Sequence, residues 1–141
     1  MMNEFVPAIM TSNVITLKPE HTLKDARELL LKHRIHHLPV LEGKKLVGII
    51  TSYDFLKLGK SLDDYASMHV RDVMTTKLAT LEPTQHIGAV AEVLVEHLFH
   101  AVPIVNDEFE LMGIVTSTDI IRYGFRKEYP ENLEKFVSEN M

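Results

Sequence analysis

The chain of 141 residues contains no cysteine and no tryptophan. Without cysteine the sequence has no disulfide bonds, thiolate zinc sites or cysteine nucleophiles, and it suits a reducing compartment. No apolar run approaches the roughly 18 residues that cross a bilayer, so we expect no membrane insertion. The first ten residues lack the positive region and the continuous apolar stretch of a secretory signal. We therefore expect a cytoplasmic protein.

The sequence also has no excess of basic residues. The 15 Lys and Arg residues are outnumbered by 20 Asp and Glu residues, which gives a formal net charge of −5. A protein that binds nucleic acid irrespective of sequence needs a basic footprint, so this balance argues against a nucleic-acid partner. What remains is the composition of a globular domain, with 45% hydrophobic and 25% charged residues.

The chain repeats itself with an offset of 64 residues, the separation of Met10 and Met74. The opening segment 6–11 (VPAIMT) returns as 70–75 (VRDVMT). Other matches follow in the same order, with one inserted residue before the last of them: Thr16 with Thr80, His33 with His97, His36 with His100, Pro39 with Pro103, and 48–54 with 113–119. Matches in this order through both halves indicate an internal duplication.

Each repeat reads as β-α-β-β-α. In the first repeat we expect strands over 14–17, 38–41 and 46–51, a helix capped by Thr22 and Asp25, and a helix over 52–58 that ends at Gly59. In the second repeat we expect strands over 78–81, 102–105 and 111–116, a helix over 87–98, and a helix over 117–123 followed by Gly124. Residues 60–69 read as a short polar helical linker.

A unit of about 60 residues buries too little surface to be stable alone. We therefore predict an α/β (α+β) fold in which two pseudo-symmetric β-α-β-β-α units pack sheet to sheet about a pseudo-twofold axis. The predicted boundaries are 1–59 for the first unit, 60–69 for the linker, 70–124 for the second unit and 125–141 for a C-terminal helical tail. In that tail Leu133, Phe136 and Val137 form a small apolar face, which packs either on the chain's own core or across a dimer or partner.

The duplicated pattern resembles the tandem pair of CBS (cystathionine-β-synthase-type) domains known as a Bateman module. The resemblance rests on the Met-Thr openings, on the HHLPV sequence at 36–40 and on the two Gly-x-x-Thr-x-x-Asp segments, and it covers residues 6–124. It implies a non-catalytic regulatory module of the stand-alone kind, which binds AMP, ADP, ATP or S-adenosylmethionine between its units and modulates a partner protein. It also implies a homodimer and no catalytic cofactor.

By the family's pattern, each of two clefts combines residues from both units. One cleft takes Thr51, Asp54, Ala79, Thr80, Phe99, His100, Ala101 and Pro103. The other takes Thr116, Asp119, Ile15, Thr16, Ile35, His36, His37 and Pro39. The resemblance implies that the apolar members enclose adenine, while the Thr and Asp residues contact ribose and phosphate.

The two Thr-x-x-Asp segments have two interpretations. Each follows a strand and opens a helix, so Thr51 with Asp54, and Thr116 with Asp119, suit a capping box. The same geometry places a carboxylate at the mouth of a cleft, where it can accept both ribose hydroxyls while the helix N-terminus favours phosphate. Lys57 follows Asp54 by three residues, and Arg122 follows Asp119 by three residues. This spacing favours an ordinary ion pair along each helix.

The two predicted clefts differ in charge. Arg34, His36 and His37 face the cleft of Asp119, whereas the matching positions in the repeat are Leu98, His100 and Ala101. We therefore predict the cleft of Asp119 as the better phosphate site. Relatives that hold several phosphates often have an arginine at the positions of His37 and Ala101, so this sequence speaks against strong triphosphate binding.

Other functions find less support in the sequence. The side chains of the neighbours His36 and His37 are expected to diverge, so His33, His36 and His37 favour packing or ligand contact over a metal site. No Gly-x-Ser-x-Gly or P-loop pattern is present, which disfavours an enzyme acting on nucleotides. A structural dimerisation module with vestigial clefts remains the alternative function.

Overall fold

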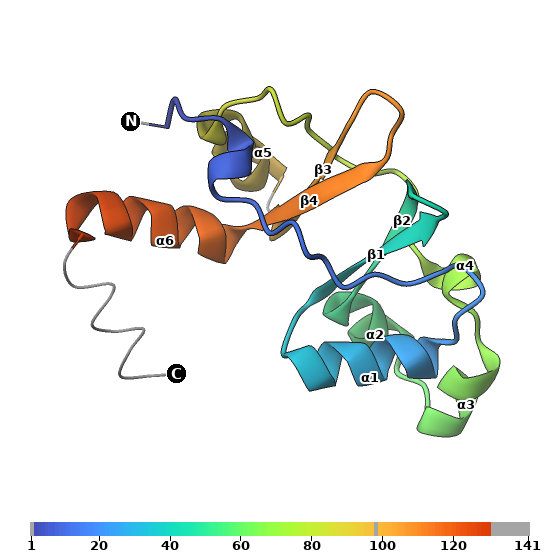
Figure 1. Ribbon diagram of the computed structural model, residues 1–141. Coiled ribbons are helices and arrows are strands. Elements are labelled where there is room, and N and C mark those ends of the chain that lie inside the picture. Colours follow the sequence, from blue (N-terminus) through green and yellow to red (C-terminus); the bar gives the residue numbers. More distant parts are fainter. Residues whose placement is uncertain (1, 98, 131–141) are drawn as a thin grey trace.

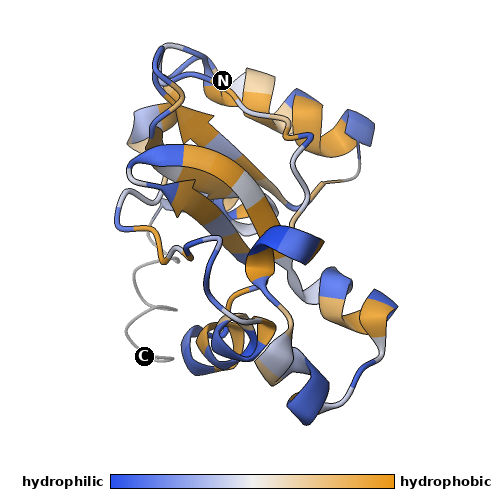
Figure 2. Cartoon of the chain, turned by 90° about the vertical axis from the view of Figure 1, so that its right-hand side faces the viewer, coloured by the Kyte–Doolittle hydropathy of each residue, from blue (hydrophilic) through white to orange (hydrophobic). Residues whose placement is uncertain are grey.

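Two β-hairpins form the centre of the computed structural model, which describes residues 2–97 and 99–130 (Figure 1). Strand β1 (His37–Glu42) pairs antiparallel with β2 (Lys45–Thr51), and β3 (Ala101–Val105) pairs antiparallel with β4 (Leu111–Thr116). The strands are hydrophobic along most of their length and lie between the helices (Figure 2). The predicted α/β class, with two related units built on small sheets, is confirmed.

The helices follow the predicted order of the repeat. They are the 3-10 turn η1 (Val6–Ala8), α1 (Leu23–His33), α2 (Ser52–Leu58), α3 (Leu62–Ser67), α4 (Val70–Val73), α5 (Ile87–His97) and α6 (Ser117–Glu128). At α1 the predicted capping box is present, because the Asp25 N–H donates to Thr22 Oγ1 at 3.1 Å and the Thr22 N–H donates to Asp25 Oδ2 at 3.0 Å. Helix α2 ends at Gly59, whose φ of 57° lies in the left-handed region that glycine tolerates.

The strands predicted over 14–17 and 78–81 are wrong as extended strands. Each segment makes a single parallel bridge, at Leu17 to Val40 and at Leu81 to Ile104. The reason lies in the next residues, because a proline two positions later has no N–H to continue a ladder and directs the chain into a turn. The segments still extend the two sheets, but only at their last residue.

The predicted end of the last helix at Gly124 is also wrong. Helix α6 continues to Glu128, and Gly124 does not adopt the positive φ of its repeat counterpart Gly59. On either side of Gly124, the Tyr123 hydroxyl donates to Glu4 Oε1 at 2.9 Å and Lys127 Nζ pairs with the same oxygen at 2.6 Å. The N-terminal segment therefore holds the second half of α6. The predicted apolar face of the tail, Leu133, Phe136 and Val137, lies outside the described residues.

The two hydrophobic cores exchange segments between the repeats. Val6, from the start of the first repeat, is fully buried against Val90 and Val115 of the second. In return, Tyr65 and Val70 belong to the core formed around β1, β2 and α1. The cores therefore do not follow the sequence boundaries at 59 and 70, because the segment before each repeat's first strand packs on the other unit.

Glycine in β2 and β4 permits this exchange. A Cβ on Gly48 would meet the Met74 sulfur at 2.5 Å, and a Cβ on Gly113 would meet the Met10 sulfur and the Thr11 carbonyl oxygen at 2.8 Å. The Met-Thr and Gly-x-x-Thr motifs of the sequence are therefore partners in space, each methionine lying over a glycine of the opposite repeat. The backbone bridges Thr11–Ile114 and Ile49–Thr75 follow directly.

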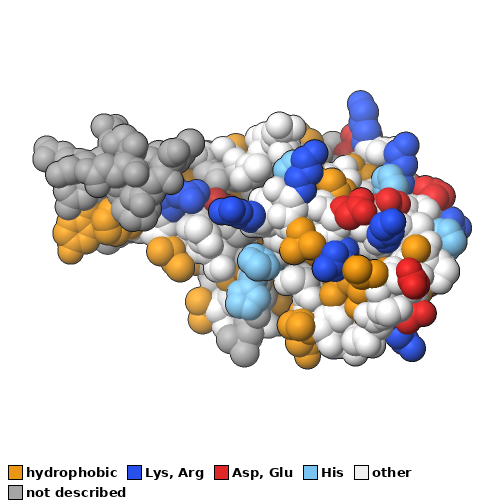
Figure 3. Space-filling view, turned by 90° about the horizontal axis from the view of Figure 1, so that it is seen from below, with side chains coloured by type: hydrophobic (Ala, Val, Ile, Leu, Met, Phe, Trp, Pro, Cys, Tyr) orange, Lys and Arg blue, Asp and Glu red, His pale blue; other side chains and the backbone are white. Residues whose placement is uncertain are grey.

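The two units meet through the starts of β2 and β4. The Leu46 N–H donates to the Phe109 carbonyl at 3.0 Å, and the Leu111 N–H donates to the Lys44 carbonyl at 3.1 Å. On the face seen from below, acidic and basic side chains are interspersed (Figure 3). Among the described residues no helix combines the length and the apolar character needed to cross a membrane.

Candidate ligand-binding site

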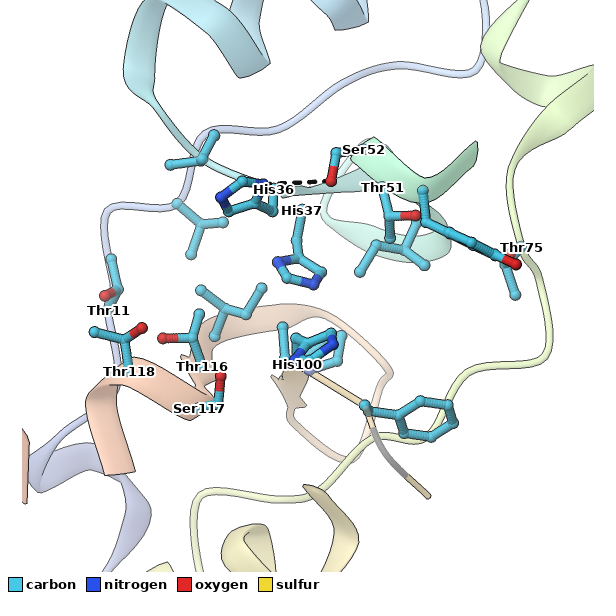
Figure 4. Close-up of a pocket in the computed structure, with 18 of the residues that line it drawn as sticks. Thr11, His36, His37, Thr51, Ser52, Thr75, His100, Thr116, Ser117 and Thr118 are labelled. Atoms are coloured by element: carbon cyan, nitrogen blue, oxygen red, sulfur yellow. Dashed lines mark hydrogen bonds between the residues drawn. The ribbon is translucent and has the colours of Figure 1, made fainter. Parts of the chain in front are cut away.

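A cavity of about 1140 Å³ lies between the units, where β2 and β4 end and α2 and α6 begin. Residues of both repeats line it, and Figure 4 shows Thr51 and Thr116 entering it from opposite units. The two clefts predicted from the sequence are therefore joined in one continuous space. The join depends on how the two hairpins face each other, which no local sequence pattern reports.

At one end of the cavity the carboxylate of Asp54 closes the N-terminus of α2. Its Oδ2 accepts from the Thr51 N–H at 2.8 Å and from the Thr51 hydroxyl at 3.2 Å, while Oδ1 lies 3.6 Å from Lys57 Nζ. The side chain of Asp54 is only 7% exposed, whereas that of Lys57 is 57% exposed. The capping and ion-pair interpretations are both confirmed here, and one carboxylate oxygen remains outside the cap.

At the other end Asp119 repeats this arrangement on α6. Its Oδ2 accepts from the Thr116 N–H at 2.8 Å and from the Thr116 hydroxyl at 3.0 Å, and its own N–H donates to Thr116 Oγ1 at 3.3 Å. Oδ1 lies 3.5 Å from Arg122 Nη1. Each end of the cavity thus presents a fixed carboxylate beside a helix N-terminus, a pairing that can accept sugar hydroxyls and attract an anion.

Three histidines gather in the middle of the cavity (Figure 4). His36 Nδ1 lies 3.3 Å from Ser52 Oγ, and the His36 carbonyl accepts from the Ser52 N–H at 3.0 Å. In the second unit the His100 carbonyl accepts from the Ser117 N–H at 2.9 Å. Burial lowers the pKa of His37 to about 4, and the nearby His36 and His100 contribute to this lowering, so the His37 ring is neutral at pH 7.

Thirteen of the sixteen predicted site residues line this cavity: Ile15, Ile35, His36, His37, Thr51, Asp54, Ala79, Phe99, His100, Ala101, Pro103, Thr116 and Asp119. Thr16, Thr80 and Pro39 do not. Ile15 and Ala79 line the space, whereas the residues that follow them, Thr16 and Thr80, lie outside its lining in both repeats. Pro39 is buried in β1, where its carbonyl accepts from the Leu17 N–H at 2.9 Å.

Thr11 and Thr75 line the cavity through the exchanged segments, and the sequence did not predict them. Thr11 lies beside β4 through its bridge to Ile114, and Thr75 lies beside β2 through its bridge to Ile49. The signal was present, because a polar Thr recurs at the same place in both Met-Thr openings. Lys77 was not predicted either, since its repeat counterpart is the uncharged Asn13.

The cavity has an excess of positive charge. Lys57 and Arg122 pair with its two carboxylates, whereas Arg34 and Lys77 also line it and belong to none of the ion pairs in the described part of the chain. Arg34 caps α1 with a left-handed φ of 53°, a conformation that costs a non-glycine residue roughly 1–2 kcal/mol. Within residues 2–97 and 99–130, no group of three or more potential metal ligands is present.

The family model of the CBS domain matches residues 6–61 and 70–126 of this chain. The chain therefore belongs to the CBS-domain family and carries two such domains in tandem. It is similar to protein MJ1225 of Methanocaldococcus jannaschii, with 30% identity over 134 residues that cover 86% of this chain and 47% of that protein. The crystal structure of MJ1225 gives a TM-score of 0.81 at 28% identity, over 86% of this chain and 48% of the other.

Two solved CBS-domain proteins similar to this chain contain adenine compounds. The CBS-domain pair of protein MJ0100, in complex with 5′-methylthioadenosine and S-adenosylmethionine, is 32% identical with a TM-score of 0.78, over 89% of this chain and 98% of that chain. CBSX2, in complex with AMP, is 27% identical with a TM-score of 0.78, over 88% and 98%. The chain spans half or less of the length of the first curated relatives it matches.

Proposed function

We propose that this chain is a non-catalytic regulatory module that binds an adenine nucleotide or S-adenosylmethionine in its cavity and modulates a partner protein. The observation that carries the proposal is the pair of capped carboxylates, Asp54 and Asp119, at the two ends of one cavity. A ligand that favours one arrangement of the two units shifts their equilibrium, and a partner can read that shift.

The lining fits the parts of an adenine ligand. Ile15, Ile35 and Phe99 provide apolar surface for the base, and the oxygen of each Asp that stands outside the cap can accept ribose hydroxyls. Arg34 and Lys77 supply cationic groups for phosphate. The complexes of the MJ0100 pair and of CBSX2 support adenine as the common element.

The test is a thermal-shift screen with AMP, ADP, ATP, S-adenosylmethionine and NAD. A ligand that binds only the native state stabilises it by about 2.7 kcal/mol at a hundred times its Kd. Replacing both carboxylates, by Asp54→Ala with Asp119→Ala, is expected to weaken binding by at least roughly tenfold to a hundredfold, because charge-assisted hydrogen bonds are lost.

Two further variants separate binding from folding. Asp54→Asn with Asp119→Asn removes the charge but keeps an acceptor for each capping N–H, so this protein should fold and still bind weakly. Asp107→Ala changes an exposed carboxylate in the β3–β4 loop and should leave binding unchanged. If no adenine compound stabilises the wild type, the ligand-binding proposal fails.

The alternative is a structural dimerisation module, and the helix surfaces favour a homodimer under either function. Leu31 and Leu56 are 61% and 79% exposed, and their repeat counterparts Val95 and Ile121 are 73% and 70% exposed. Matching helix positions of the two units therefore expose apolar side chains, and the internal pseudo-twofold relates one set to the other. A symmetric apolar surface of this kind suits pairing with a second copy of the chain.

Light scattering is expected to give the mass of a dimer for the wild type and of a monomer for Leu56→Glu with Ile121→Glu. Leu62→Glu on α3, which is exposed but outside the repeat, should leave the dimer intact. A monomeric wild type would contradict the homodimer.

A further inference from the structure

A second, smaller cavity of about 400 Å³ lies in the first unit, between α1, α2 and α3 (Figure 1). We call it the α1–α2 pocket, and its floor consists of Leu30, Ile35, Phe55 and Tyr65. The volume is at the lower end of the range for small-molecule sites in proteins, roughly 300–1,000 Å³. The pocket therefore has room for one small ligand.

The floor of the α1–α2 pocket is apolar and belongs to the core of the first unit. Leu30 and Tyr65 are 7% and 6% exposed, and Phe55 and Ile35 pack against the same core. The ring of Tyr65 meets the ring of Phe55 edge-on, with the centroids 5.1 Å apart, and the Tyr65 hydroxyl donates to the Phe55 carbonyl at 3.5 Å. A third aromatic ring that enters the pocket can bury its surface against this pair.

Two arginines of α1 and its C-cap, Arg27 and Arg34, line the same pocket. In residues 2–97 and 99–130 neither guanidinium takes part in an ion pair. No Asp or Glu of these residues lines the pocket either. Two guanidiniums without an acidic neighbour attract a carboxylate, which an arginine binds through parallel charge-assisted hydrogen bonds.

Arg34 adopts a strained backbone conformation at this place. Its φ of 53° lies in the left-handed region, which at the end of α2 is taken by Gly59. Strain of this kind is tolerated where the position serves a function. The repeat counterparts of Arg27 and Arg34 are Ala91 and Leu98, so a unit of this fold does not require either arginine. A cationic pair beside an apolar floor is therefore a property of the first unit.

We propose that the α1–α2 pocket is a second binding site, specific for a small carboxylic acid with an aromatic body. The two guanidiniums bind the carboxylate, and the apolar floor takes the ring. An aromatic amino acid is a poor ligand, because its ammonium group would lie beside two arginines with no carboxylate of the pocket to pair with it.

This site is separate from the cavity between the units and does not depend on the function proposed for that cavity. Arg34 lines both spaces, whereas Arg27, Phe55 and Tyr65 line only the pocket. Of the four residues of the proposed pairing surface, Leu31 is the one that lines the pocket. Pairing of two copies and binding in the pocket are therefore compatible.

The experiment is a titration of the full, ¹⁵N-labelled chain, followed by the NMR shifts of its backbone amides. Three compounds with the same phenylpropyl frame are compared: 3-phenylpropionate, the uncharged 3-phenylpropanamide and the zwitterion L-phenylalanine. We expect 3-phenylpropionate to shift the amides of residues 27–36, 52–55 and 65, with a Kd on the order of a few millimolar or below. The amide and L-phenylalanine should bind roughly tenfold more weakly or not at all, because the charge-assisted hydrogen bonds are lost or opposed.

Matched variants test the role of the arginines. Arg27→Ala should weaken the binding of 3-phenylpropionate roughly tenfold, and Ala91 shows that alanine fits this helix position. Lys32→Ala removes an exposed cation of α1 that does not line the pocket and should leave the binding unchanged. Equal binding of acid and amide, unchanged binding in Arg27→Ala, or shifts centred on residues 116–119 would overturn the inference. No adenine compound is used here, so failure of this site leaves the proposed function standing, and the reverse also holds.

Discussion

The two ends of the cavity have the same acidic helix cap and different surroundings. At both ends a Thr N–H donates to the Asp Oδ2 at 2.8 Å and a cation lies about 3.5 Å from Oδ1. The side chains facing these caps differ, because His37 and Asn13 of one repeat correspond to Ala101 and Lys77 of the other. The helix caps are duplicated, whereas these cavity-lining positions have diverged.

This difference separates the residues that the fold requires in both halves from those that vary between the two ends of the cavity. The Met10–Gly113 and Met74–Gly48 contacts recur in both halves, as do the bridges that bring Thr11 and Thr75 to the cavity. A residue present in only one half is not required by the fold, since the other half folds without it. His37 and Lys77 are therefore the positions where the two ends of the cavity differ in side-chain chemistry.

The largest expected effect concerns His37 and the stability of the ligand-free protein. The pKa of His37 is lowered to about 4 from 6.5, so the unfolded chain binds a proton below pH 6.5 that the folded protein resists until about pH 4. Stability should therefore fall by about 2–3 kcal/mol as the pH drops through this window, and by no more from this residue below it. His37→Ala should remove that part of the pH dependence.

Urea unfolding of the wild type and of His37→Ala at pH 7.5, 5.5 and 4.5 measures this difference. Any loss of packing in the variant is the same at each pH, so only the change in the gap between the two proteins reports the titration. His33→Gln, which alters an exposed histidine, should track the wild type at every pH. If the difference in free energy of unfolding between wild type and His37→Ala stays constant with pH, His37 does not make the stability pH-dependent and the prediction is contradicted.

Local sequence signals predicted correctly those elements whose ends are set by a capping residue or a glycine at the end itself. The bounds of α2 and β4 match the prediction, because Thr51 and Thr116 cap the following helices and Gly59 takes a left-handed φ. Gly124, the repeat counterpart of Gly59, shows the limit of such signals, because it lies in the interior of α6 and does not end that helix. That helix is held from outside by Glu4, a residue 119 positions from Tyr123, and no pattern near Gly124 reports this contact.

Long-range placement accounts for what the sequence did not predict at the site. Whether Val6 packs on its own repeat or on the other depends on contacts more than 80 residues apart, and the exchange decides that Thr11 and Thr75 reach the cavity. The residues of the helix caps and of the strand starts were predicted because the duplication marked them. The sequence did not predict that the two clefts join, because this depends on the angle at which the two hairpins meet.

A smaller effect distinguishes the two glycines under the exchanged methionines. In Gly48→Ala the three atoms nearest the new Cβ all belong to the Met74 side chain, whose sulfur at 2.5 Å can rotate away while its Cβ at 3.1 Å cannot, so a loss of about 1 kcal/mol is expected. In Gly113→Ala the Cβ also meets the Thr11 carbonyl oxygen at 2.8 Å, and that oxygen accepts from the Ile114 N–H at 3.0 Å. Relief requires the backbone to shift, so we expect a loss of about 1–3 kcal/mol.

Urea unfolding at pH 7.5 compares these two variants, with Gly43→Ala excluded as a control because its φ of 61° strains any side chain. Gly124→Ala is the suitable control, since a Cβ on Gly124 would meet no atom within 4 Å and alanine favours a helix interior. Hydrogen exchange at the Ile114 amide gives a second readout, which should rise in Gly113→Ala and not in Gly48→Ala. Equal losses in the two glycine variants would mean that both methionine contacts yield alike, and that residues 10–11 are held on β4 no more rigidly than residues 74–75 are held on β2.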